Sequence, residues 1–218
     1  MVGMWIQGSR SSQDSAKSLH FRLGTAIRSQ RNQWDHSSLD PVRATHTSCP
    51  ITTYQSVLLH VILSILMTRD FRAVDLGLRH CVPADEYDLL MALVQSCQRL
   101  GIFSYPDMLA QYHPDAPLKM IWVGVEEMKR FALALYKVAH MCTVMNTRET
   151  SREKLLTLAD LSFPVPDSDE MWDHPGDDPE ALPRVAAQNN RTENGDPKEW
   201  ISTSYTILHD RRVNFNWI

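Results

Sequence analysis

The sequence has few cysteines for its 218 residues, and they are widely spaced: Cys49, Cys81, Cys97 and Cys142. They form no CxxC pair, which excludes a zinc ribbon or zinc cluster within this chain. A free cysteine on an apolar helix face acts as a small hydrophobe, so we expect four reduced thiols in an intracellular protein. The glycines are also few, and they form neither a GxGxxG fingerprint nor a phosphate-binding loop.

A strongly basic region and a long hydrophobic run are missing as well. The net charge is -4, so the chain lacks the electrostatic footprint of a nucleic-acid-binding domain. The strongest apolar run, residues 57 to 67, is too short to span a bilayer and contains His60 and Ser64. Residues 1 to 9 have no signal-peptide pattern. The chain contains no GxSxG or HExxH motif, and we expect no enzyme, no cofactor and no metal in it.

The most regular stretch is residues 118 to 143, which the apolar spacing predicts to be the central helix. Seven residues recur at alternating steps of four and three, as one helix face requires: Ile121, Val125, Met128, Ala132, Leu135, Ala139 and Cys142. The charged residues fall outside this line. Glu126 stands four residues before Arg130, the favourable order for a surface ion pair. Glu126 and Glu127 point roughly 100° apart, which predicts a solvated face rather than a catalytic carboxylate pair.

Three further helices are predicted, at residues 12–30, 52–68 and 85–100. The first has an apolar stripe of Ala16, Leu19, Leu23, Ala26 and Ile27; the third ends before Gly101, a left-handed terminator. Residues 34–50 and 102–117 are predicted to be irregular, and residues 71–81 a linking turn. The fold class is therefore all-α, a multi-helix domain. Residues 173–218 are polar and acidic, which predicts a poorly ordered C-terminal tail.

Five stretches in the same order resemble the fungal-specific transcription factor regulatory domain, the helical region downstream of zinc-cluster or zinc-finger DNA-binding modules. ITTYQSVLLHVILSIL, from Ile51, is similar to the family's buried TYQ…LLH helix, and YDLLMALVQSCQRLGIF, from Tyr87, to its L…L…CR..G.F helix. WVGVEEMKRFALALYKV, from Trp122, resembles the W..WV..E..RR….Y signature. LTLADLSFPVPDSDEMWD, from Leu156, resembles the L….L…LP….LW segment, and residues 4 to 28 resemble the preceding helix pair.

The resemblance implies a regulatory domain over residues 1–172, in an incomplete copy, followed by the tail at 173–218. It assigns structural signature roles to Trp122, Val123, Glu126, Lys129, Arg130, Tyr136 and Trp172, with Lys129 in place of the family's first arginine. It also implies a nuclear protein that controls transcription through protein partners of the transcription machinery. A homodimer is among the partners left open. DNA contact and zinc would belong to a module outside this chain.

Two other functions stay open at this point. A helical scaffold or dimerisation module would be favoured by a large exposed apolar patch. A helical enzyme would need convergent polar groups with perturbed pKa values in a pocket. The acidic segment at residues 167–180, with seven acids and no Lys or Arg, is either an activation segment or a solvated linker beside an anchored Trp172, and we favour the anchor.

Overall fold

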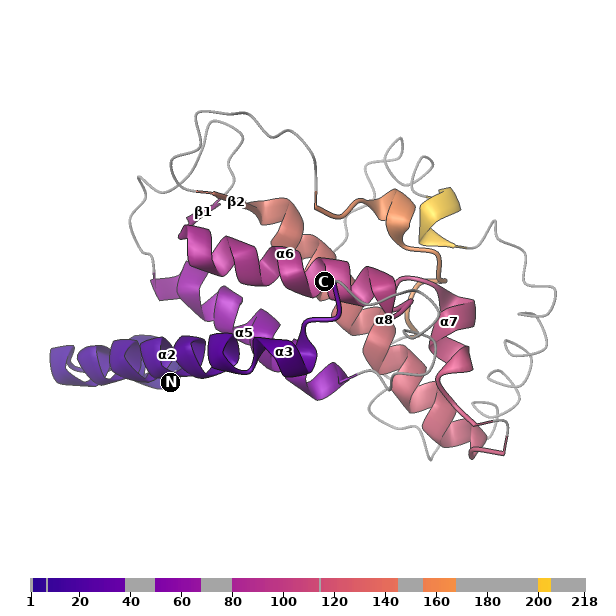
Figure 1. Ribbon diagram of the computed structural model, residues 1–218, viewed down its shortest axis with the longest axis horizontal. Helices are drawn as coiled ribbons and strands as arrows, with labels where there is room; N and C mark the ends of the chain where they lie inside the picture. Colours follow the sequence, from indigo (N-terminus) through magenta and orange to yellow (C-terminus); the bar gives the residue numbers. More distant parts are fainter. Residues whose placement is uncertain are drawn as a thin grey trace. The chain divides into compact units, whose positions relative to one another are not determined.

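The structure is a computed structural model that describes residues 2–6, 8–37, 50–67, 80–113, 115–144, 155–167 and 200–204. The chain divides into two compact units, and Figure 1 labels the elements of both. Unit 1 comprises Met1–Ala44, Pro50–Arg99 and Lys137–Leu155; unit 2 comprises Thr45–Cys49, Leu100–Tyr136 and Leu156–Ile218. The predicted boundary between a domain at 1–172 and a tail at 173–218 lies in a part of the chain outside the described residues, so it stays a prediction.

Unit 1 is built from helices and one pair of short strands. Its elements are α1 (Val2–Ile6), α2 (Arg10–Ser29), α3 (Arg31–Trp34), α5 (Ile51–Met67), β1 (His80–Val82), α6 (Ala84–Arg99) and β2 (Cys142–Val144). The helices predicted at 12–30, 52–68 and 85–100 are confirmed to within two residues as α2, α5 and α6. The predicted linking turn at 71–81 is wrong at its end, since His80 and Cys81 belong to β1, which pairs in parallel with β2.

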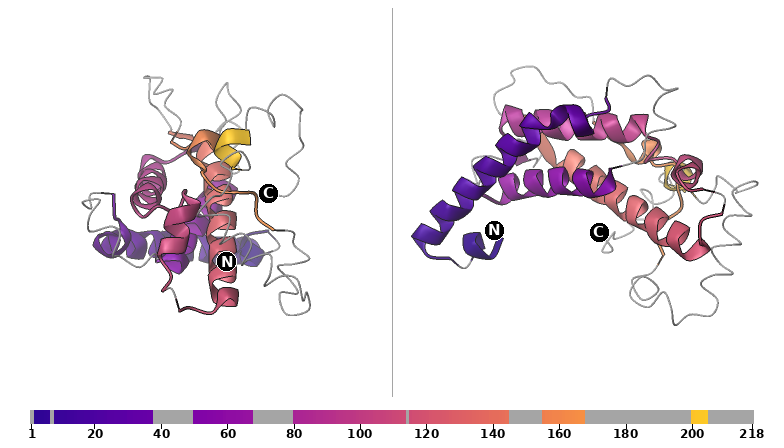
Figure 2. Two further views of the ribbon diagram at one scale, coloured as in Figure 1. Left: turned by 90° about the vertical axis from the view of Figure 1, so that its right-hand side faces the viewer. Right: turned by 60° about the horizontal axis from the view of Figure 1, so that its bottom comes forward.

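The core of unit 1 lies where α6 packs along α5 and α2 packs on α5 (Figures 1 and 2). The predicted face of α6 is buried, including Leu90, Leu93 and Cys97. The predicted stripe of α2 is only partly correct: Ala16 and Ile27 are buried, whereas the other predicted members are half-buried or exposed. Helical spacing identifies a broad apolar sector, but the position of α5 decides which part of that sector is covered.

Local signals explain where α2 begins and where α6 ends. Ser9 caps α2, its hydroxyl accepting a hydrogen bond from the backbone N–H of Ser12 at 3.4 Å. Beyond the end of α6, Gly101 has φ +69°, the left-handed conformation expected of a helix terminator.

Between α3 and α6, Arg31 donates to the carboxylates of Asp35, at 2.7 Å, and of Asp88. This ion-pair network fastens the end of the α2–α3 segment to α6.

Unit 2 contains α7 (Tyr105–Ala110), most of α8 (Leu118–Met141), the 3-10 helix η1 (Leu158–Asp160) and a helical turn at residues 201–204. The helix predicted at 118–143 is confirmed, and all seven members of its apolar line are buried. The irregular stretch predicted at 102–117 is wrong for α7, where Pro106 occupies an early helical position that tolerates proline.

Residues 156 to 167 cross unit 2 as a strap that contains η1 and has no other helix. Ser162 bridges Ser104 in parallel, and Pro164 bridges Trp200 in the antiparallel sense. Ile201 is buried against this strap, and its N–H donates to the carbonyl of Phe163 at 3.0 Å. Residues 200–204 are thus an ordered piece within the predicted tail; the rest of 173–218 lies outside the described residues. The described part of the chain is otherwise all-α apart from the one short strand pair.

Candidate functional site

Three residues of α8 converge on a single residue of the strap, Asp167. Trp122 Nε1 donates to Asp167 Oδ2 at 2.8 Å, and Arg130 Nη2 donates to its carbonyl oxygen at 2.7 Å. The backbone N–H of Asp167 donates to Glu126 Oε2 at 2.9 Å. Trp122, Glu126 and Arg130 are spaced four residues apart, so they lie along one side of the helix. The side chain and both main-chain polar groups of Asp167 are thus bound by α8.

Glu126 also forms a buried ion pair with Lys129. Lys129 Nζ donates to Glu126 Oε1 at 2.6 Å, and each side chain is 1% exposed. The ammonium of Lys129 also lies 5.2 Å from the centre of the Tyr105 ring, within cation–π range. Both carboxylate oxygens of Glu126 are therefore used, one by Lys129 and one by Asp167. We call Trp122, Glu126, Lys129, Arg130 and Asp167 the Asp167 cluster.

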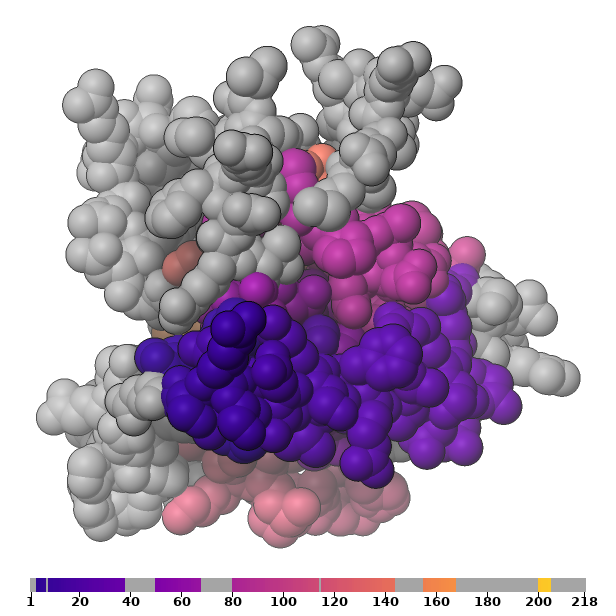
Figure 3. Space-filling view, turned by 90° about the vertical axis from the view of Figure 1, so that its left-hand side faces the viewer, coloured from indigo at the N-terminus to yellow at the C-terminus, as the bar shows by residue number. Residues whose placement is uncertain are grey.

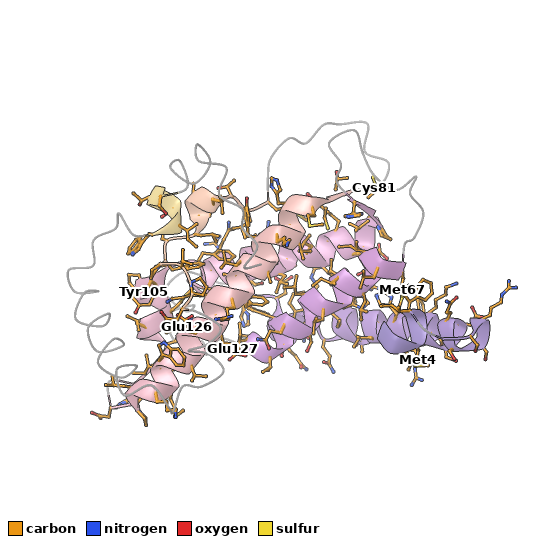
Figure 4. All side chains as sticks on the ribbon, turned by 180° about the vertical axis from the view of Figure 1, so that it is seen from behind. Met4, Met67, Cys81, Tyr105, Glu126 and Glu127 are labelled. Carbon is orange, nitrogen blue, oxygen red and sulfur yellow. The ribbon has the colours of Figure 1, made fainter. Side chains whose placement is uncertain are left out.

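Tyr105, which belongs to α7, packs against Lys129 of the cluster. Figure 4 shows Tyr105 close to Glu126 of α8. Burial, followed by the negative charges of Glu126 and Asp167, raises the pKa of Tyr105 to about 12, so its hydroxyl stays protonated at neutral pH. The backbone N–H of Tyr105 donates to the carbonyl of Ser162 at 2.9 Å, which joins α7 to the strap. The cluster therefore ties three segments of unit 2 together.

The structure corrects two predictions for α8. Glu126 does not lie on a solvated face, and its partner is Lys129 rather than Arg130. Both errors have one cause: the strap covers this side of the helix and supplies Asp167, a partner 41 residues along the chain from Glu126. The role of Asp167 was missed because an acid after Pro166 is also typical of a solvated linker. The spacing of Glu126 and Lys129, three residues apart, was the available signal.

The other predicted signature residues lie apart from these bonds. Val123 and Tyr136 are half-buried at other positions of α8, and burial raises the pKa of Tyr136. Trp172, predicted to anchor the end of the domain, lies outside the described residues. Gly124 has a packing role that the sequence alone did not reveal: a Cβ at this position would collide with the hydroxyl of Tyr112. Glycine here allows Tyr112 to approach α8 closely.

A second polar cluster lies in unit 1, where α2, α5 and α6 meet. The buried His60 donates from Nε2 to Glu86 at 3.0 to 3.2 Å, and the ring of His20 stacks on that of His60 with centroids 4.1 Å apart. His20 Nε2 donates to the carbonyl of His60 at 3.2 Å, and Arg28 lies 3.7 Å from Glu86. Sequence spacing could not reveal this cluster, because its members come from three helices.

The environment of this histidine cluster shifts two pKa values. Burial lowers the pKa of His20, and the hydrogen bond to the His60 carbonyl opposes that shift only in part. Burial acts to raise the pKa of Glu86, but the hydrogen bond from His60 and the charges of His60 and Arg28 outweigh it, so the pKa is lowered. The cluster thus favours neutral His20 and ionised Glu86, the combination that holds the three helices together without an excess of positive charge.

The remaining observations concern metal ions, cysteine thiols and membrane-spanning helices. Within the described ranges, no group of three or more His, Cys, Asp or Glu residues is arranged to hold a metal ion. Cys81, Cys97 and Cys142 form no disulfide bond among the described residues, and burial raises the pKa of Cys142 to about 11, which makes it a poor nucleophile. Cys49 lies outside the described residues. In the part of the chain that the structure describes, no helix has the length and apolar character needed to cross a membrane.

We compared the chain with models of known protein families, with curated proteins and with solved structures, and no match was found in any of the three.

Proposed function

We propose that the chain is a regulatory and interaction domain of a nuclear fungal transcription factor. In this proposal it controls transcription through protein partners, and a zinc-containing module outside the chain contacts DNA. The resemblance on which this rests is carried by five sequence motifs in one order, among them the stretch from Trp122 and the stretch from Leu156.

The observation that supports the proposal most is the Asp167 cluster. Trp122, Glu126 and Arg130 belong to the first of these motifs, and Asp167 belongs to the second. Their hydrogen bonds give a physical reason for the two motifs to occur together in one chain. A regulatory domain must change shape or partner in response to a signal. The hydrogen bonds between α8 and Asp167, one of which uses the buried and ion-paired carboxylate of Glu126, form a contact on which such a change can act.

A reporter assay tests the proposal. Residues 1–218 are inserted between a heterologous DNA-binding domain and an activation domain in a fungal cell, and reporter output is compared with that of the same fusion lacking the insert. We expect the insert to lower reporter output severalfold at equal protein level. The Glu126→Gln insert should restore part of the output, because the cluster that holds the strap is weakened.

The matched control is Glu127→Gln, the same chemical change at the neighbouring residue, which should behave as the parent insert does. An insert that leaves the reporter unchanged would refute a regulatory role. Equal effects of Glu126→Gln and Glu127→Gln would refute the role of the Asp167 cluster in it.

A further inference from the structure

The outer face of α5 is apolar and exposed. This 17-residue helix contains no Asp, Glu, Lys or Arg. Its inner side is buried, whereas Leu59 is 58% exposed and Leu66 is 45% exposed; Ile62 and Leu63, between them, are half-buried. The four residues follow steps of three and four, so they form one stripe along the helix. In a soluble protein a single exposed leucine needs no explanation, but a contiguous apolar stripe marks a surface that binds something.

The adjoining flank of α2 extends this stripe. His20 stacks on His60 and a Cβ at Gly24 would touch the His60 ring, so this side of α2 faces α5. On one flank of that side, Arg28 reaches Glu86 of α6. The opposite flank, which lies on the outer side of α5, carries Leu19 and Leu23.

Leu19 is 43% exposed and Leu23 is half-buried. We call the combined surface the leucine face: Leu19, Leu23, Leu59, Ile62, Leu63 and Leu66. The helix α2 crosses the view of Figure 3, with α6 above it, and Figure 4 labels Met67, the last residue of α5.

We propose that the leucine face is a homodimer interface, on which the same face of a second copy of this chain packs. The absence of Asp, Glu, Lys and Arg from α5 is the first reason. A charged group of a partner placed on α5 would lose its water and find no opposite charge there. A second copy instead presents the same uncharged surface, so the two faces are complementary without any unpaired charge. Packing of one patch on its own copy is the arrangement that a twofold-symmetric dimer requires.

The spacing and the size of the face specify the kind of dimer. Steps of three and four between apolar residues allow the ridges of one helix to enter the grooves of another, as in helix pairs. A stable interface buries about 800 Å² on each partner, and six aliphatic side chains, several already half-buried, offer less than that. The dimer should therefore be in equilibrium with the monomer at micromolar concentrations. This inference does not depend on the proposed role in transcription.

Sedimentation equilibrium or light scattering on the full chain tests the proposal. The weight-average mass of the parent should rise from the monomer value of 25.0 kDa toward twice that value as its concentration increases from low micromolar to several hundred micromolar. The double variant Leu59→Glu with Leu66→Glu should remain at the monomer mass over the same range. Circular dichroism melts would establish that this variant is folded.

The matched control is Phe21→Glu. Phe21 is 70% exposed and lies on α2, but on the flank that points away from Leu19 and Leu23. This variant should dimerise as the parent does. A parent that stays at 25.0 kDa at every concentration, or equal dimerisation of all three proteins, would overturn the proposal. The reporter assay tests a cluster on α8, whereas the mass measurement tests a surface on α2 and α5. Failure of the dimer proposal is therefore distinguishable from failure of the proposed function.

Discussion

The buried pair of Glu126 and Lys129 allows a prediction of stability in which the double change is milder than either single change. Glu126→Gln leaves the Lys129 ammonium buried without its counter-charge, at a site where the side chain is 1% exposed. Breaking one side of a buried ion pair costs about 3–5 kcal/mol. Lys129→Met leaves the Glu126 carboxylate with the N–H of Asp167 alone and should cost a similar amount. Either loss is a large share of a domain stability of about 5–15 kcal/mol.

The double variant removes both charges and keeps the side-chain volumes close to the original. The amide side chain introduced by Glu126→Gln would still have an oxygen to accept the hydrogen bond from Asp167 N–H, and the methionine introduced by Lys129→Met fills the space of the lysine stem. Replacing both members of a buried pair with uncharged residues is often close to neutral. We therefore expect the double variant to be more stable than either single variant. The free energies of unfolding from urea melts of all four proteins give the coupling directly.

An exposed pair with the same spacing provides the control. Asp14 and Lys17 also stand three residues apart, but both side chains are more than half exposed and 3.9 Å separates the charged atoms. Asp14→Asn should stay within about 0.5 kcal/mol of the parent. If the costs of Glu126→Gln and Lys129→Met simply added in the double variant, or if both were as small as that of Asp14→Asn, the pair would not be buried as described.

Three further predictions concern the core and the histidine cluster. Because the pKa of His20 is lowered from 6.5, the unfolded chain binds the proton more readily, so stability should fall as the pH drops through and below 6.5, and His20→Gln should flatten that dependence in urea melts. The lowered pKa of Glu86 adds a further loss of stability below pH 4.5, with the same sign. Leu135→Asp places a carboxylate at a fully buried position of α8 and should cost several kcal/mol; a parent-like urea midpoint would contradict the position of α8. Gly24→Ala should destabilise by about 1–3 kcal/mol despite the better helix propensity of alanine, because the new Cβ would lie 2.9 Å from the buried His60 ring; a gain in the thermal midpoint would disprove that contact.

The sequence by itself determined the helices of this protein and the buried line of α8. Apolar residues at steps of three and four reflect the geometry of the helix itself, and a terminator such as Gly101 acts on its own neighbours. These signals are local, so α2, α5, α6 and α8 could be placed to within two residues. The short helix α7 was missed because the prolines of its stretch, Pro106, Pro114 and Pro117, are typical of irregular structure.

Only the tertiary structure decided which side chains on those helices are covered, and by what. The sequence placed Glu126 and Lys129 among the solvated charges of α8, but both are buried. Glu126 lies beside Asp167 of the strap, and Lys129 lies over the Tyr105 ring of α7. In the same way, Leu19 was expected in the core and is exposed, because α5 lies against the neighbouring side of α2. Burial of a charge or exposure of a leucine depends on a partner far away in the sequence, and no periodicity along one helix carries that information.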